Sequence, residues 1–339
     1  MTGRQRIFAA LSGERPDTTP VMLHNFMAAA REAGVRMKEY RRDPRAIARV
    51  FVRAVETYGY DGVLVYIDTA TLAGALGVPV EYPDDEPAVC RGALLDELRD
   101  VDRLPPPDVA RHEGVQVWLE AVRILKRELG QEYFIRGNCD QAAFSLAALV
   151  RSAEAWMLDL MDPAGSESAL RLLDYCHKAS EQFLRLMAEA GADMLSNGDS
   201  SAGTSLISPG LHRRFAHPYE ARLAGLAHDL GLPYALHVCG NARAILGDLC
   251  RTGADALELD FKTDAAAARD ALGGRVTFIG NIDPTGVMAM GTPAVVGAKC
   301  RELMELFAGT PRFILNAGCA LPAGTPPANI HAMVRAARA

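Results

Sequence analysis

The feature that most constrains the fold is an alternation of short apolar runs with longer amphipathic segments along the whole chain. Between the runs, apolar residues recur three and four positions apart, and some segments open with Ser-Pro or Thr-Pro, which is typical of helices. The runs expected to be strands span residues 19–26, 61–68, 132–138, 192–199, 233–240, 255–260, 275–283 and 312–319. Eight such units in 339 residues favour a parallel, closed (β/α)8 TIM barrel over an open doubly wound sheet.

We expect residues 1–339 to form a single barrel domain. The stretch 84–130 interrupts the alternation with Asp-Asp-Glu-Pro and Leu-Pro-Pro-Pro-Asp. We expect it to be an insertion after the second strand and not a linker between domains.

Composition narrows the class of partner. Hydrophobic residues make up 49% of the chain and charged residues 23%, as in an ordinary globular protein with a large core. The net charge of -6 gives no general attraction to nucleic acid or to an anionic membrane, so a small-molecule partner is expected. The start of the chain lacks a secretory signal, and no run reaches the ~18 apolar residues of a membrane span, which predicts a cytoplasmic protein. The seven cysteines form no disulfide framework and are expected to be reduced, buried or metal-bound.

Polar side chains gather where the expected strands end. In a parallel barrel these ends share the face on which barrel enzymes carry their active sites. For any single Asn or Asp, the ordinary polarity of loops explains the position equally well. The residues in question are His24, Asn25, Asp68, Asn138, Asp140, Asn197, Asp199, His237, Cys239, Glu258, Asp260, Asn281, Asp283 and Cys319.

His237, Cys239 and Cys319 have the composition of a catalytic zinc site. Zinc prefers thiolate and imidazole ligands, and a catalytic site takes three of them from the protein. Residues two apart on a strand point to the same side, so an inward His237 brings Cys239 inward too. The alternative is that these are a hydrogen-bonded core histidine and small buried thiols, as expected for the remaining cysteines. Those are Cys90, Cys139, Cys176, Cys250 and Cys300.

Four segments of the chain, in order, resemble signature segments of the uroporphyrinogen decarboxylase superfamily. They are YGYDGVLVYIDTATLAGALGVPVEYP, SSAGTSLISPGLHRRFAHPY, FIGNIDP and NAGCALPAGTPPANIHAMV. The resemblance implies a (β/α)8 barrel, in agreement with the strand count. It also implies one of two activities, since the superfamily contains decarboxylases and zinc-dependent, corrinoid-linked methyltransferases.

The residues favour the methyltransferase branch. The decarboxylases hold substrate carboxylates with an arginine-rich N-terminal stretch, but here no arginine lies between Arg15 and Arg31. The decarboxylases also carry Gly-His-Gly where this chain has a cysteine at position 319. His237, Cys239 and Cys319 match the zinc ligands of the methyltransferases. Asp68 aligns with the decarboxylases' catalytic aspartate, although without the arginines its role does not carry over.

The resemblance therefore predicts transfer of a methyl group between a corrinoid and a small thiol, folate or methoxylated substrate, with the direction left open. The corrinoid, methylcobalamin in one state, is expected on a separate corrinoid protein, since the chain shows no corrinoid-binding motif. Glu258, and less so Asp260, is a candidate proton acceptor or fourth metal ligand, or else a structural carboxylate paired with a cation. Asp68 is the second catalytic candidate. Candidate substrate or corrinoid contacts, with loop capping as the competing explanation, are Asn197, Asp199, Asn281 and Asp283.

Two other functions stay open at this point. One is a metal-free decarboxylase of a small carboxylic acid or a porphyrinogen, with Asp68 as its polar anchor. The other is a corrinoid or tetrapyrrole carrier with His237 as an axial ligand, which would not need two thiols beside the histidine.

Overall fold

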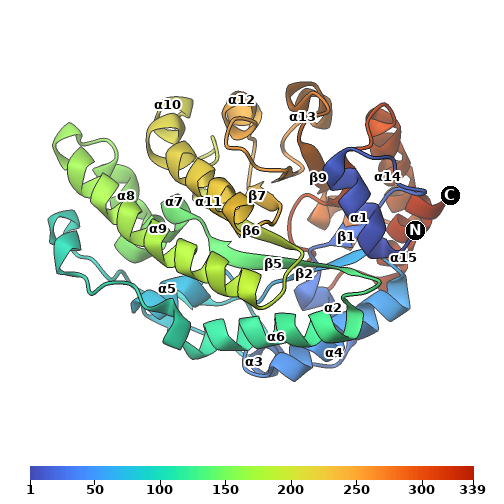
Figure 1. Cartoon of the computed structure of the whole chain (residues 1–339), viewed down its shortest axis with the longest axis horizontal. Coiled ribbons are helices and arrows are strands. Elements are labelled where there is room, and N and C mark those ends of the chain that lie inside the picture. Colours follow the sequence, from blue (N-terminus) through green and yellow to red (C-terminus); the bar gives the residue numbers. More distant parts are fainter.

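The computed structural model describes residues 1–339, except for the side chain of Pro163. Its main sheet is an eight-stranded parallel barrel in chain order, which confirms the predicted fold (Figure 1). The barrel closes where Val21, just before the first strand, pairs in parallel with Leu315 of the last. The strands are β1 Met22–Leu23, β2 Gly62–Val65, β5 Phe134–Gln141, β6 Met194–Gly198, β7 Tyr234–Val238, β8 Ala256–Leu259, β9 Thr277–Ile282 and β10 Phe313–Ala317.

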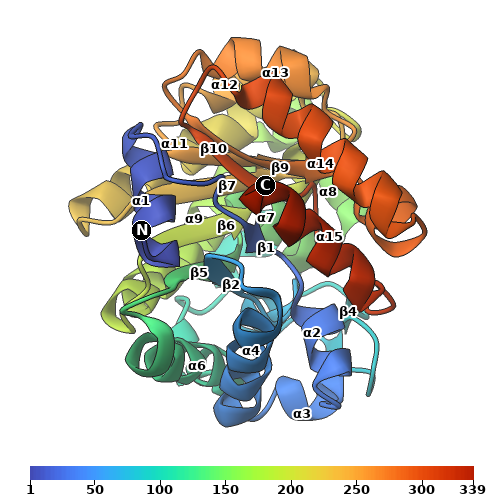
Figure 2. The same cartoon turned by 90° about the vertical axis from the view of Figure 1, so that its right-hand side faces the viewer.

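Helices form the outer layer of the barrel. The amphipathic helices α4 (Pro44–Tyr58), α6 (Glu113–Leu129) and α9 (Ser166–Glu189), for example, bury their apolar faces against the strands and against one another. Figure 2 shows α14 and α15, the last long helices, lying beside β10 and returning the chain to the side of the first strand. The helices are α1 Gly3–Ser12, α2 Phe26–Glu32, α3 Met37–Tyr40, α4 Pro44–Tyr58, α5 Thr71–Leu76, α6 Glu113–Leu129, α7 Ala143–Arg151, α8 Ala153–Asp159, α9 Ser166–Glu189, α10 Pro209–Leu211, α11 His217–Asp229, α12 Leu246–Leu249, α13 Ala265–Leu272, α14 Pro293–Phe307 and α15 Pro327–Arg338.

Helix α1 closes the end of the barrel at which the strands begin. Its Ile7, Ala10 and Leu11 pack in one buried cluster with inward side chains from the starts of the strands, such as Phe134 and Ile314. This end is therefore filled by apolar side chains. A functional site is therefore expected at the opposite end, where the strands finish.

The interior changes character from one layer to the next because strand side chains alternate in direction. Two residues beyond Phe134 on β5 lies Arg136, which is fully buried. Two residues beyond Ala256 on β8 lies Glu258, which is 1% exposed. The same step on β7 leads from Ala235 in the apolar layer to His237. A polar layer therefore lies above the apolar one, at the mouth of the barrel.

The segment between β2 and β5 carries more than one helix. After α5 come the short antiparallel strands β3 (Val80–Glu81) and β4 (Val89–Cys90). Helix α6 then packs on α4 and against β2 and β5, so it belongs to the barrel's outer layer. The part of 84–130 outside the repeating units is thus shorter than expected, and together with the residues just before it spans roughly residues 77–112.

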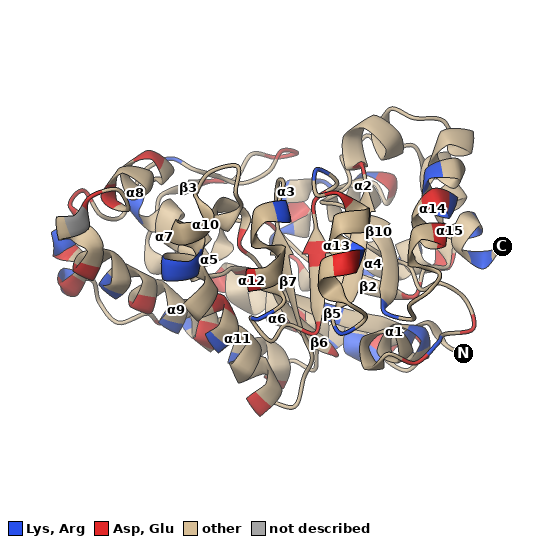
Figure 3. Cartoon of the chain, turned by 90° about the horizontal axis from the view of Figure 1, so that it is seen from above, with Lys and Arg blue, Asp and Glu red and all other residues tan. Residues whose placement is uncertain are grey.

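Positively and negatively charged residues are interspersed along the outer helices (Figure 3). Many form exposed pairs, such as Arg171 with Glu167 and Arg185 with Glu181. In the described part of the chain, no helix has the length and hydropathy that crossing a membrane requires.

Candidate metal centre

The mouth of the barrel brings together the three residues that the sequence singled out. His237 lies near the end of β7, and Cys239 follows it by two residues. Cys319 lies in the loop that follows β10. That loop packs closely on the residues after β8, because a Cβ at Gly318 would lie 2.4 Å from the backbone nitrogen of Phe261. Glycine at 318 is what lets Cys319 reach the centre.

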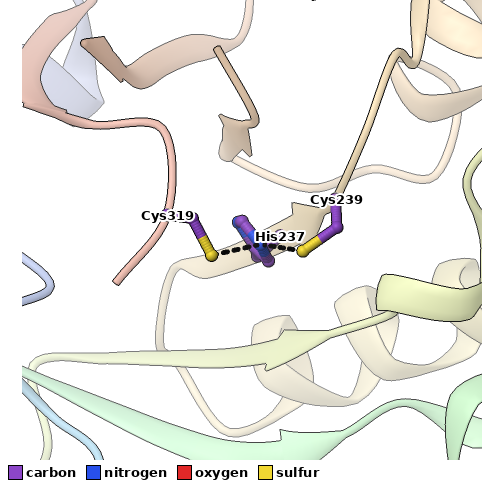
Figure 4. A group of neighbouring side chains, drawn as sticks. All are labelled: His237, Cys239 and Cys319. Atoms are coloured by element: carbon purple, nitrogen blue, oxygen red, sulfur yellow. Dashed lines mark hydrogen bonds between the residues drawn. The ribbon is translucent and has the colours of Figure 1, made fainter. Parts of the chain in front are cut away.

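The two thiols flank the imidazole from opposite sides (Figure 4). Nε2 of His237 lies 3.0 Å from Sγ of Cys239 and 3.9 Å from Sγ of Cys319. All three ligand atoms lie within 4.8 Å of one another. His237 is 7% exposed, and both thiols are half-buried, so the group faces a cavity and is not sealed in the core.

The donor set fits zinc. Ligands ~2.0–2.3 Å from a tetrahedral zinc ion lie ~3.5–3.8 Å from one another, close to the separations seen here. Two sulfurs and one imidazole nitrogen are the soft and borderline donors that zinc prefers, and a fourth position stays open for a substrate. Among the described residues, this is the group of histidine, cysteine and carboxylate side chains that converges closely enough to hold a metal ion.

Proton sharing holds the metal-free group together. The hydrogen bond from Cys319 and the charge of His237 lower the pKa of Cys239 to about 3, although burial opposes this. Burial alone would lower the pKa of His237, but the Cys239 thiolate raises it to about 9. The hydrogen bond with Cys239 and burial hold the pKa of Cys319 far above its usual range. Without metal the centre is therefore a thiolate, an imidazolium and a thiol. The Ser200 hydroxyl, 3.4 Å from the Cys239 sulfur, donates to that thiolate.

Glu258 lies on the side of the His237 ring that faces away from the two thiols. Its Oε2 lies 3.8 Å from Nδ1 of His237, the ring nitrogen that faces away from the thiols. The same oxygen accepts a 2.7 Å hydrogen bond from Arg136, and Oε1 accepts one of 2.7 Å from Asn316. Burial opposes ionisation of this carboxyl, but Arg136 and His237 lower its pKa below the ordinary value. The placement argues against a fourth metal ligand and fits an anionic group that orients the imidazole.

A cavity of about 220 Å³ opens over the centre. Several residues that were picked out at strand ends line it, and most of its remaining wall is apolar or aromatic. The lining residues are His24, Phe26, Met27, Leu64, Tyr66, Ile67, Asp68, Thr69, Pro87, Asn138, Gln141, Gly198, Ser200, His237, Cys239, Glu258, Cys319 and Ala320.

Asp68 lies on the wall of this cavity, but half of its carboxylate is used structurally. Oδ1 accepts hydrogen bonds from the backbone of Ala70 and Thr71 and from the Thr71 hydroxyl, which starts α5. Oδ2 has no partner in the described structure and lies 4.0 Å from the guanidinium of Arg41. Asp68 therefore anchors a loop at the wall, and its second oxygen faces Arg41.

The four residues expected to contact substrate or corrinoid are instead used by the fold. Nδ2 of Asn197 donates to the carbonyl of Cys139, and its Oδ1 accepts from the hydroxyl of Tyr234. Asn197 faces the helices because it is offset by one residue from the inward positions of β6. Asn281 on β9 donates to the carbonyls of two residues that follow β8.

Asp199 and Asp283 are also structural. Oδ1 of Asp199 accepts from both the backbone and the hydroxyl of Ser145, and burial raises the pKa of Asp199 to about 8. Asp283 starts a helical turn by accepting from the backbone of Thr285 and Gly286. None of the four is among the described residues that line the cavity, so the structure favours loop and strand support over contact with a substrate held there, and contact with a corrinoid at the mouth stays a prediction.

Asp260, Asn25 and Asp140 likewise support the backbone or a neighbouring side chain. Asp260 accepts from the backbone of Gly240 and of Lys262 and holds the loop that carries Cys239, which favours a structural role. Asn25 lies 3.4 Å from the hydroxyl of Tyr60, and Asp140 accepts from the backbone of Leu72.

Sequence reasoning missed Arg136, Asn316 and Ser200. Arg136 had a detectable signal, because an arginine within the apolar run 132–138 must be paired when the strand is buried. Its partner Glu258 is 122 positions away and was identifiable only from the fold. Asn316 and Ser200 are ordinary strand-end and loop residues in the sequence, and nothing in their spacing marked them.

Comparison with known proteins places the chain in one family. A family model described as uroporphyrinogen decarboxylase (URO-D) matches residues 2–339. The methylcobamide:CoM methyltransferase MtbA of Methanosarcina acetivorans is 27% identical over 343 residues, covering 99% of this chain and 98% of that protein. A uroporphyrinogen decarboxylase of Syntrophotalea carbinolica is 30% identical over 340 residues, covering 94% and 93%. Overall sequence identity does not distinguish methyl transfer from decarboxylation. The residues of the site must therefore distinguish these two activities.

Solved structures agree on the fold. A methyltransferase from Methanosarcina mazei superposes with a TM-score of 0.91 at 24% identity, over 100% of this chain and 98% of that one. A putative vitamin-B12 independent methionine synthase from Listeria monocytogenes superposes with a TM-score of 0.56 at 14% identity, over 96% of each chain.

Proposed function

The chain belongs to the uroporphyrinogen decarboxylase (URO-D) family, and from this premise we propose that it is a zinc-dependent methyltransferase. It moves a methyl group between a corrinoid held by a partner protein and a small thiol, folate or methoxylated substrate. The observation that carries the proposal is the convergence of His237, Cys239 and Cys319 at the open end of the barrel. The similarity to methylcobamide:CoM methyltransferases over nearly the whole chain supports it.

The three side chains would hold the metal through Nε2 and the two sulfurs. With both cysteines as thiolates, their charges balance the 2+ charge of the ion. Bound there, zinc would favour the thiolate form of a substrate thiol or polarise an ether oxygen. Glu258, fixed by Arg136 and Asn316, lies 3.8 Å from Nδ1 of His237, where its negative charge would favour a ring orientation that leaves Nε2 for the metal.

The size of the cavity supports a corrinoid that stays outside. A volume of about 220 Å³ accommodates a molecule somewhat larger than benzene, which fills an engineered cavity of ~150 Å³. A corrin macrocycle is far larger than this. The small substrate therefore enters the cavity, and the corrinoid approaches the mouth on its own protein.

The charge of the cavity argues against the decarboxylase alternative. Asp68 lies on the wall of the cavity, which is compatible with the polar anchor that a decarboxylase would require. A substrate with several carboxylates also needs cationic groups, and the described lining includes no lysine or arginine. The two guanidiniums next to lining carboxylates are already engaged: Arg136 donates to Glu258, and Arg41 donates to the carbonyls of Pro83 and Glu86.

Two assays on one preparation test the proposal. Zinc-loaded protein should transfer the methyl group of free methylcobalamin to a small thiol, followed by the change in cobalamin absorbance and by detection of the methyl thioether. Cys319→Ala should abolish this transfer, and Cys250→Ala should retain it. Incubation with uroporphyrinogen should release no carbon dioxide. Stepwise formation of coproporphyrinogen by the metal-free protein would overturn the proposal in favour of decarboxylation.

A further inference from the structure

We propose that Ser200 is a positioning residue of the metal centre, whose hydroxyl donates a hydrogen bond to the Cys239 sulfur while that sulfur ligates zinc. The bond draws charge away from the sulfur, so the ion keeps more of its positive character for the substrate. The inference rests on the proposed function and adds to its site a residue that acts through a ligand.

The need for such a donor follows from the charge of the proposed centre. Thiolates at Cys239 and Cys319 together neutralise zinc, and the electron density that they donate weakens its action as a Lewis acid on a substrate sulfur or oxygen. Hydrogen bonds to cysteine sulfurs are known to shift the potentials of copper and iron–sulfur sites, because they stabilise charge on the sulfur. A donor beside one thiolate can therefore alter the reactivity of the metal without touching the substrate.

Ser200 is the hydrogen-bond partner that Cys239 would keep when the metal binds. In the described structure the sulfur contacts Nε2 of His237 at 3.0 Å, the Cys319 thiol, and the Ser200 hydroxyl at 3.4 Å. His237 and Cys319 are themselves proposed ligands, so both would direct their donor atoms at the ion. The serine hydroxyl lies on the cavity wall and is left as a donor to the thiolate.

Hydrogen bonds on both sides of Ser200 fix the position of its backbone. The N–H of Asp199 donates to the carbonyl of His237 at 2.8 Å. The hydroxyl of Ser145, on α7, donates to the Asp199 carboxylate and accepts from the N–H of Ser201 at 2.8 Å. Ser145 therefore connects the residue before Ser200 with the residue after it.

Close backbone packing joins this loop to the loop that carries Cys239. A Cβ at Gly203 would lie 2.4 Å from the carbonyl oxygen of Cys239, and a Cβ at Gly240 would lie 2.6 Å from Oγ of Ser205. Glycine at these two positions lets the loops meet without a side chain between them. The distance between the Ser200 hydroxyl and the Cys239 sulfur is thus set by the fold.

Cobalt(II) in place of zinc tests the hydrogen bond, because the filled d shell of zinc gives no visible spectrum. In Ser200→Ala the sulfur-to-cobalt charge-transfer band should move to longer wavelength, since the sulfur electrons lose their stabilisation. Ser200→Thr keeps a hydroxyl and should keep the wild-type band. The matched control is Ser201→Ala, because Ser201 is held through its backbone N–H, and its band should not move. An unchanged band in Ser200→Ala would overturn the inference.

Methyl transfer by the zinc-loaded proteins measures the consequence for reactivity. The probes are 2-mercaptoethanol and 2-mercaptoethanesulfonate as acceptors, with free methylcobalamin as the donor. Ser200→Ala should still bind zinc but should transfer ~10-fold more slowly, and Ser200→Thr should recover most of the rate. Loss of zinc from Ser200→Ala would assign the serine to metal retention and overturn the inference.

The spectrum and the transfer rate keep the two proposals separate. A band shift in Ser200→Ala, with no methyl transfer by the wild-type protein, would support the hydrogen bond and contradict the proposed function. Transfer by the wild-type protein at a rate that Ser200→Ala matches would retain the function and overturn the inference.

Discussion

The sulfur of Cys319 lies 3.9 Å from Nε2 of His237, although 82 positions separate the two residues in the chain. Cys319 lies in the loop after β10 and His237 lies on β7, and these two strands are not neighbours in the sheet. They meet because all the strands of a parallel barrel finish at one end, and loops at that end converge over its axis. The proposed metal centre depends on this closure.

Removing the remote thiol should remove the metal. We expect close to one zinc per chain in the wild-type protein and a loss of most of it in Cys319→Ala, because two protein ligands hold zinc far more weakly than three. The measurement is metal content after gel filtration. Cys250→Ala is the control, since the sulfur of Cys250 bonds to the carbonyl of Ala271 at 3.6 Å and is not part of the converging group. Full zinc retention in Cys319→Ala would refute the site.

X-ray absorption should report the ligand set directly. In the resting protein we expect about two sulfur neighbours near ~2.3 Å and one or two nitrogen or oxygen neighbours near ~2.0–2.1 Å. A third sulfur should appear only when a thiol substrate is added. A resting spectrum with nitrogen and oxygen neighbours alone would contradict the assignment.

Zinc binding should release about two protons near pH 7. In the metal-free centre His237 has a pKa of about 9 and is protonated, and Cys319 keeps its proton because its pKa is raised. Cys239, with a pKa of about 3, is already ionised. Zinc affinity should therefore rise with pH up to about 9, by up to ~100-fold per unit. Calorimetry in buffers of different ionisation enthalpy measures the release, and a value near zero would contradict this proton distribution.

Removing one partner of the buried ion pair between Arg136 and Glu258 should lower the free energy of unfolding substantially. Arg136 and Glu258 are 0% and 1% exposed, so Arg136→Met leaves a buried carboxylate without its cation and should cost ~3–5 kcal/mol of unfolding free energy. Adding Glu258→Gln should recover part of that loss. The matched control is Arg269→Met at an exposed pair with Asp270, which should cost less than ~1 kcal/mol. Urea unfolding measures all three, and a small effect of Arg136→Met would show that the layer is hydrated.

Buried His24 should make the fold sensitive to mild acid. Burial lowers the pKa of His24 to about 4, below its ordinary value of 6.5. As the pH falls from 6.5 toward 4, the unfolded chain binds the proton before the folded one does, so stability falls in this window. In metal-free protein, His24→Gln should reduce the loss between pH 7.5 and pH 5 by ~1–2 kcal/mol. Identical pH profiles from urea unfolding would show that His24 is protonated in the folded state.

Chelation should abolish methyl transfer and leave the barrel folded. The core packs apolar side chains from eight strands and their helices, and that burial outweighs what one metal site contributes. Far-ultraviolet circular dichroism before and after metal removal is the measurement. Loss of most of the helical signal on gentle chelation would identify the zinc as structural.

Much of the architecture followed from local pattern. Each strand predicted from an apolar run is present, since a buried parallel strand must be apolar on both faces and its length is limited by the barrel. The expected insertion extended too far because the residues of α6 follow a proline-rich stretch and read as part of it. A helix can be assigned to the barrel only when its contacts with α4 and β5 are known.

Site residues could be predicted where their role depends on residue type alone. They could not be predicted where the role depends on the direction in which a side chain points. Thiols and an imidazole are rare enough at strand ends to be recognised as a group. Asn197 and Asn281 are common polar residues, and only the structure shows that their amides bind backbone carbonyls or a neighbouring tyrosine. On β6 a shift of one residue decides between the cavity and the helices.

The sequence by itself determined the alternation of strands and helices, the family and the identity of the three candidate ligands, because these depend on residue type and spacing along the chain. The tertiary structure decided which polar groups share a cavity. It paired Arg136 with Glu258 across 122 positions and placed that carboxylate behind His237, and it left His24 without a partner. The physical reason is that charge pairing, burial and cavity shape depend on distances between strands, which only the closure of the barrel sets.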